Sequence, residues 1–174
     1  MITDIQIMKI KNEVMRILHV PGNYTGGILE MAIVADYHMS VEELNEITKR
    51  VANGLKHQNE IFRNVRLNLI KWVSDAEIIK EVSSLTKLQM GRAYDDYENC
   101  KLQQLSQAED GSTKTLDELF RQLKLFYARS KLIIVLTDGA YRIEDESKVT
   151  EYLNPFLKRK IIIVNRGEII KNYV

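Results

Sequence analysis

Apolar and polar positions along this chain divide into runs of strand type and stretches with helical spacing. Three runs are nearly continuous in apolar residues, at 28–35 (ILEMAIVA), 131–138 (KLIIVLTD) and 160–165 (KIIIVN). Such runs are typical of strands buried on both faces of a parallel sheet. Alternating stretches at 65–73 and 76–82 predict two further strands, paired with each other as a hairpin.

Stretches with helical spacing separate these strands. One predicted helix covers 40–56 and another lies within 111–130, with apolar faces formed by Val41, Leu44, Ile47, Val51 and Leu55 in the first and by Leu116, Leu119, Phe120, Leu123 and Tyr127 in the second. Ser40 with Glu43, and Thr115 with Glu118, have the spacing of a capping box at the helix starts.

Two more helices are predicted near the ends of the chain. A helix from 146 to 158 is interrupted or bent at Pro155. The segment from 3 to about 19 is also helical, and we expect it to cover the core through an apolar stripe made of Ile2, Ile5, Met8, Met15 and Leu18.

The alternation of strands and helices predicts an α/β fold with a mainly parallel, doubly wound, Rossmann-like sheet and helices on both faces. We expect one domain over residues 1–174, with an N-terminal helix and loop at 1–27, a core at 28–165 and a C-terminal extension at 166–174. Within the core, 83–112 is expected to be a helical or irregular insertion.

Composition excludes several classes of function. The chain has 25 basic and 24 acidic residues among its 174, so its net charge of +1 predicts no nucleic-acid footprint and no basic membrane patch. Cys100 is the single cysteine, which excludes an internal disulfide and a zinc site of several thiolates. No stretch has the ~18 uncharged apolar residues of a spanning helix. We therefore expect a cytoplasmic protein.

Polar residues at the strand ends carry the candidate chemistry. Asp36, His38 and Ser40 follow the first strand in the sequence DYHMS, Thr113 lies in GSTKT before a helix, and Asp138 ends a later strand in VLTDG. Ligands of open α/β sheets bind beyond the carboxyl ends of the strands, where the strand order reverses. Asp36 and Asp138 are both expected at that edge.

The three segments, in this order and these contexts, resemble a von Willebrand factor A (VWA) domain over about residues 28–165. Such domains have a metal-ion-dependent adhesion site built from Asp-x-Ser-x-Ser, a threonine and an aspartate. The resemblance implies that Asp36, Ser40, Thr113 and Asp138 are metal ligands, with His38 in place of the first serine. It also implies that an acidic residue of a protein partner completes the metal site.

The chemistry of the metal depends on His38. Mg²⁺ prefers oxygen ligands, which Asp36, Ser40, Thr113 and Asp138 supply. An imidazole nitrogen suits zinc, iron, nickel or copper better. We expect Mg²⁺ or Mn²⁺, while His38 leaves three alternatives: a different transition metal, a histidine that only forms hydrogen bonds, or a site that has lost its metal.

Each of these residues also has a purely structural interpretation. Ser40 and Thr113 are suited to cap the helices that follow them, and Asp36 is suited to accept hydrogen bonds from the strand-to-helix turn. If so, the protein is a VWA-like scaffold with a degenerate, metal-free site, which associates through its N-terminal helix or a sheet edge.

An enzymatic alternative is a magnesium-dependent phosphohydrolase. DYHMS resembles the Asp-x-Asp-x-Thr of haloacid dehalogenase-like phosphatases, with His38 in place of the second aspartate. The lysine and the paired acidic motif that such enzymes carry later in the chain are not evident in the sequence. We therefore expect a protein-interaction module without catalytic activity.

Overall fold

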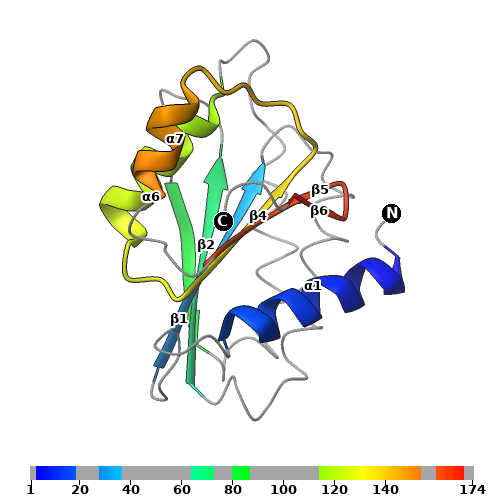
Figure 1. The fold of residues 1–174 in the computed structure, drawn as a ribbon. Coiled ribbons are helices and arrows are strands. Elements are labelled where there is room, and N and C mark those ends of the chain that lie inside the picture. Colours follow the sequence, from blue (N-terminus) through cyan, green and yellow to red (C-terminus); the bar gives the residue numbers. More distant parts are fainter. Residues whose placement is uncertain are drawn as a thin grey trace.

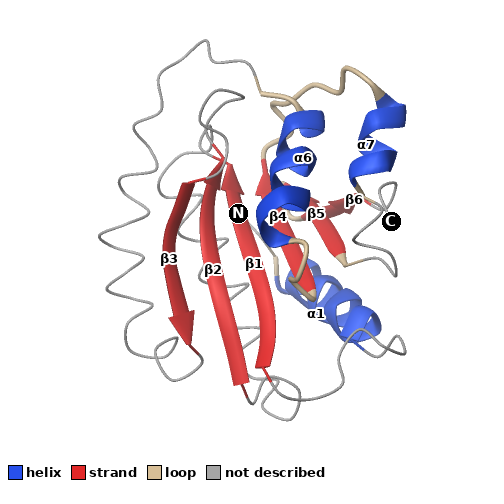
Figure 2. Ribbon diagram, turned by 90° about the vertical axis from the view of Figure 1, so that its left-hand side faces the viewer, coloured by secondary structure: helices blue, strands red, loops and turns tan. Residues whose placement is uncertain are grey.

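The structure is a computed structural model in which the described residues are 3–18, 28–36, 64–72, 80–86, 114–153 and 160–170. The described strands form one six-stranded sheet in the order β3-β2-β1-β4-β5-β6 (Figures 1 and 2). Their bounds are β1 Ile28–Asp36, β2 Asn64–Trp72, β3 Lys80–Thr86, β4 Leu132–Thr137, β5 Ile161–Asn165 and β6 Glu168–Ile170.

The four central strands of the sheet are parallel. β1 pairs in parallel with β2 on one side and with β4 on the other, and β4 pairs in parallel with β5. The edge strands β3 and β6 are antiparallel to their neighbours. The sequence runs outward from β1 to β3 and then returns to β4 beside β1, so the strand order reverses between β1 and β4. The predicted α/β class with a mainly parallel sheet is confirmed.

Helices lie on both faces of this sheet. α6 (Leu116–Tyr127) and α7 (Glu146–Tyr152) pack together on one face, and α1 (Asp4–Leu18) lies on the other, in contact with β4 (Figure 1). The core under α6 combines alternate strand residues with the helix face predicted from the sequence, and its members include Ala32, Val34, Ile70, Trp72, Leu119, Phe120, Leu123, Ile133, Val135, Ile161 and Ile163.

The predicted cap of α6 is confirmed. The Thr115 hydroxyl accepts a hydrogen bond from the backbone N–H of Glu118 at 3.2 Å, and this bond satisfies one of the donors left free at a helix start. The helix predicted over 40–56, with its cap Ser40, lies outside the described residues.

The predicted buried stripe of α1 is wrong at Ile5 and Met8, while Met15 is partly buried and the side chains of Ile2 and Leu18 lie outside the described part. Ile5 and Met8 are exposed, at 66% and 59% of their surface, whereas Ile10, Val14 and Ile17 are buried. Both sets satisfy helical spacing, because this helix carries apolar residues around more than one side. The helix packs its β-branched set against the sheet. The sequence pattern alone does not show which of the two sets is buried.

The two antiparallel edges also differ from the prediction. The predicted pairing of a third strand with β2 is confirmed, but β3 begins at Lys80, four residues later than expected, and runs to Thr86. Part of the predicted C-terminal extension is β6, which was not anticipated. Arg166 and Gly167 both have positive φ, 50° and 88°, which is the geometry of a two-residue hairpin turn between β5 and β6.

The hairpin contacts α1 through one side chain. Gln6 donates a hydrogen bond from Nε2 to Glu168 Oε1 at 2.9 Å. Gly167 has φ of 88°, a backbone conformation that favours glycine, and a Cβ atom there would displace the end of the Gln6 side chain, which lies 2.7 Å away. Within the described ranges, no helix is both long enough and apolar enough to cross a membrane.

Two phenylalanines of α6 provide a matched test of this packing. Phe120 is fully buried in the core, whereas Phe126 is 69% exposed. Phe120→Ala is expected to lower the free energy of unfolding by about 3–5 kcal/mol, because it leaves a cavity. Phe126→Ala is expected to change it by less than about 0.5 kcal/mol. Urea denaturation followed by circular dichroism measures both, and equal losses would contradict the assigned helix face.

Candidate functional site

The carboxyl edge of the parallel sheet carries one row of large or polar side chains on the face covered by α6. Trp72, Asp36, Thr137 and Asn165 end β2, β1, β4 and β5. Asp36 pairs in register with Trp72, and Thr137 pairs with Asn165. The pairing of β1 with β4 ends at the residues directly before Asp36 and Thr137. The row therefore crosses the sheet at the point where the strand order reverses.

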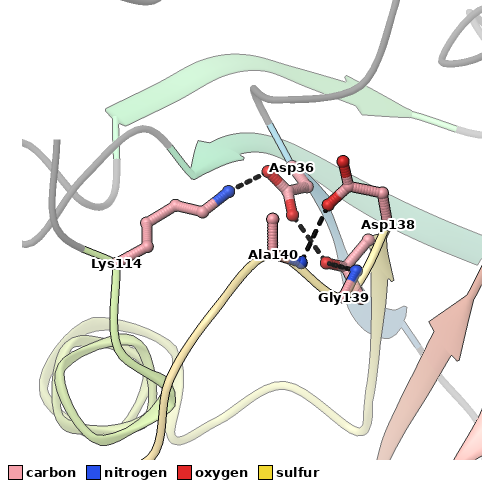
Figure 3. A network of polar contacts seen from close by, with 6 residues as sticks. Asp36, Lys114, Asp138, Gly139 and Ala140 are labelled. Atoms are coloured by element: carbon pink, nitrogen blue, oxygen red, sulfur yellow. Dashed lines mark hydrogen bonds and ion pairs between the residues drawn. The ribbon is translucent and has the colours of Figure 1, made fainter. Parts of the chain in front are cut away.

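Asp36 is the centre of this row. It is fully buried, and its Oδ2 accepts a hydrogen bond of 2.5 Å from the Thr137 hydroxyl. That hydroxyl in turn accepts from the backbone N–H of Gly139 at 3.0 Å. The other oxygen, Oδ1, forms an ion pair with Lys114 Nζ (Figure 3). Both carboxylate oxygens of Asp36 are thus engaged by groups of the chain.

Lys114 places a cation inside the protein. Its side chain is 1% exposed, and Nζ lies 4.7 Å from the centre of the Trp72 ring, within range of a cation–π interaction. Burial lowers the pKa of Lys114 most strongly, and the negative charges of Asp36 and Asp138 oppose that shift. We assign Lys114 as an ammonium paired with the Asp36 carboxylate, because the contact is direct and the aromatic face adds further stabilisation.

Backbone hydrogen bonds hold Lys114 in place. Arg142 N–H donates to Lys114 O at 3.0 Å, and Leu116 N–H donates to Arg142 O at 2.8 Å. These bonds join the segment before α6 to the loop that follows β4. The same loop carries Tyr141, whose ring centre lies 5.7 Å from that of Trp72. Burial, and then the charge of Asp36, raise the pKa of Tyr141.

Asp138 is the partly exposed acid of the site. It directly follows β4, and its Oδ1 accepts a hydrogen bond from Ala140 N–H at 3.0 Å, which closes a tight turn (Figure 3). Its charge acts on the ammonium of Lys114. Among the described residues, two carboxylates and one ammonium therefore meet at this edge, so negative charge is in excess among them.

Buried polar atoms without a partner flank the acidic centre. Within the described part of the chain, Trp72 Nε1 and Asn165 Oδ1 have no hydrogen-bond partner. Asn165 lies against Gly139, where a Cβ atom would come within 2.8 Å of Asn165 Nδ2. Gly139 also has φ of 87°, so both its backbone conformation and its close approach to Asn165 favour glycine in the turn after Asp138.

The structure brings together two of the five residues predicted for the site. Asp36 and Asp138 share the carboxyl edge, whereas His38, Ser40 and Thr113 lie outside the described residues, so their roles stay predictions. The sequence reasoning missed Lys114, although the residue stands in the GSTKT segment already singled out. It also missed Thr137, which precedes Asp138 in the VLTDG segment.

Within the described residues, the ammonium of Lys114 disfavours a divalent ion at Asp36, because an ion bound to this carboxylate would lie close to the ammonium. Two unit positive charges about 4 Å apart repel by about 4 kcal/mol at an effective dielectric constant of 20, and a second charge on the ion doubles the effect.

Comparison with known proteins adds no assignment: the sequence matches no protein-family model and no curated protein.

The buried ion pair predicts a strong coupling between its two members. Asp36→Asn and Lys114→Met are each expected to lower the free energy of unfolding by about 3–5 kcal/mol, because each leaves a buried charge without its partner. The double variant is expected to lose less than the sum of the two. Urea denaturation of the four proteins gives the coupling energy.

An exposed pair on α6 is the control for that cycle. Glu118 and Arg121 are 25% and 41% exposed, and Glu118→Gln is expected to cost less than about 1 kcal/mol. If Asp36→Asn or Lys114→Met cost no more than Glu118→Gln, the pair would not be buried and paired as described.

The turn after Asp138 predicts a second effect. Gly139→Ala is expected to destabilise the protein by about 1–2 kcal/mol through its left-handed backbone, and further through its contact with Asn165. Adding Asn165→Ala removes only the contact, so the double variant is expected to recover part of the loss. Thermal unfolding measures both, and a Gly139→Ala variant as stable as the wild type would contradict this turn geometry.

Proposed function

We propose that this chain is a VWA-like protein-interaction module that works in the cytoplasm and docks a protein partner at the carboxyl edge of its sheet. One observation carries the proposal: Asp36 at the end of β1 and Asp138 directly after β4 meet where the strand order reverses. The parallel strands run in the order β2-β1-β4-β5, and open parallel sheets bind their ligands at such a reversal.

The burial of Asp36 and the engagement of both its oxygens favour a binding function over a catalytic one. A nucleophilic or proton-transferring carboxylate needs an oxygen that a substrate can approach. Asp36 is fully buried, with one oxygen on Lys114 and the other on Thr137. We therefore assign Asp36 a structural role at this edge. Of the two acids Asp36 and Asp138, Asp138 is the one that a partner can contact.

The resemblance to VWA domains gives one version of this docking. In that version a divalent ion is held by Asp36, Ser40, Thr113 and Asp138, and an acidic residue of the partner completes its coordination. The ligands Ser40 and Thr113 lie outside the described residues, so this version stays a prediction.

One observation favours the phosphohydrolase as a second candidate. Lys114 contacts Asp36 directly, and this contact supports a role for Lys114 as the lysine that such enzymes carry later in the chain. Hydrolysis of p-nitrophenyl phosphate with Mg²⁺, compared between wild type and Asp36→Asn, separates the two functions. Turnover by the wild type that Asp36→Asn abolishes would establish the enzyme, whereas we expect no turnover that depends on Asp36.

The docking proposal predicts that Asp138 is needed to hold a partner. Tagged wild type, Asp138→Asn and the matched control Glu151→Gln, which alters an exposed acid on α7, are used to capture proteins from an extract of the source cells. A true partner is expected to be retained by wild type and control and to bind Asp138→Asn more weakly, on the order of tenfold or more.

Quantitative mass spectrometry followed by biolayer interferometry with the purified partner measures that difference. A partner that binds all three proteins equally would show that docking occurs elsewhere on the chain, and the carboxyl edge would lose its proposed role.

A further inference from the structure

The candidate site contains its own positive charge. Lys114 Nζ contacts Asp36 Oδ1, the side chain is 1% exposed, and Asp36 is fully buried. A divalent ion at a site of this kind would neutralise the carboxylates that the strand ends bring together. Lys114 already supplies a positive charge to the same carboxylate, from inside the chain.

The placement of Lys114 is built into the fold at several points. The residue directly precedes Thr115, the N-cap of α6. Two backbone hydrogen bonds join its segment to the loop after β4, and the Trp72 ring lies beside its ammonium. These contacts come from separate elements, so the ammonium is held at the edge rather than resting there as a mobile surface charge.

We propose that Lys114 is a resident cation that takes the place of a divalent metal at this edge, so that the site is formed and docks its partner without any metal ion. The inference rests on the proposed function only in taking the carboxyl edge as the docking site. Its test uses the isolated chain, so the failure of partner docking and the failure of this inference are seen in different experiments.

The single tryptophan provides a direct readout. Trp72 is the only tryptophan in the chain, and its ring centre lies 4.7 Å from Lys114 Nζ. Any ion that enters the site or displaces the ammonium changes the electrostatic field at the indole. Tryptophan emission therefore reports on this edge, and thermal unfolding reports on the stability that a bound ion adds.

The experiment titrates the chelator-treated full chain with Mg²⁺, Mn²⁺ or Zn²⁺. For the wild type we expect no saturable change in emission and no change in melting temperature when chelator is added. Saturable binding to the wild type that Asp138→Asn abolishes would overturn the proposal, because the site would then hold a metal beside Lys114.

Removal of the ammonium is expected to create a metal site. Lys114→Met removes the ammonium that contacts the buried Asp36, so Mg²⁺ or Mn²⁺ is expected to bind in its place. At a metal concentration a hundred times the dissociation constant, the melting temperature is expected to rise by about 5–10 °C. The double variant Lys114→Met, Asp36→Asn lacks the carboxylate and is expected to lose this response.

The remaining outcomes are also decisive. If Lys114→Met folds and no ion stabilises it, Lys114 does not stand in for a metal and the proposal fails. If Lys114→Met does not fold without metal, refolding with and without Mg²⁺ becomes the measurement. Recovery only with the ion supports the proposal, and recovery under neither condition overturns it. Lys114→Arg keeps the charge and is the control, expected to remain insensitive to metal.

Discussion

The carboxyl edge of this protein depends on the ion pair between Asp36 and Lys114. A buried carboxylate without a partner is costly, since water that would otherwise stabilise its charge is excluded. Asp36 ends the central strand β1 and is fully buried, so it requires a compensating group. Lys114 supplies that group, and this requirement fixes where the chain enters α6 and where the loop after β4 must run.

The same pair marks the boundary between core and site. In the half of the sheet nearest the carboxyl edge, the residues facing α6 are apolar until the last position, where Trp72, Asp36, Thr137 and Asn165 form a row across the sheet. The apolar rows stabilise the sheet by removing surface from water. The final row lies where loops replace helices above the sheet, so polar groups there can meet one another.

A cation that belongs to the chain differs physically from one that binds from solution. A bound ion makes a site depend on the concentration of that ion and on the protonation of its ligands. A lysine held by α6, by Trp72 and by backbone hydrogen bonds belongs to the folded chain and needs no ion from solution. In the described part of this edge, the positive charge that balances Asp36 therefore comes into place when the chain folds.

The sequence by itself determined the elements whose pattern is local. The apolar runs gave β1, β4 and β5, and the spacing of Leu119, Phe120 and Leu123 gave the buried face of α6. Capping chemistry gave its start at Thr115. The positions of Asp36 and Asp138 at the strand ends were also predictable, because parallel strands end at a common edge.

Tertiary structure alone decided the rest, because it depends on contacts between distant segments. The pairing of Asp36 with Lys114 joins residues 78 positions apart, and no local periodicity encodes it. Packing against the sheet chose Ile10, Val14 and Ile17 of α1 over Ile5 and Met8, since both sets fit a helix. Lys114 follows the predicted ligand Thr113 in the sequence. Only the strand order and the burial of the folded chain place its ammonium against Asp36.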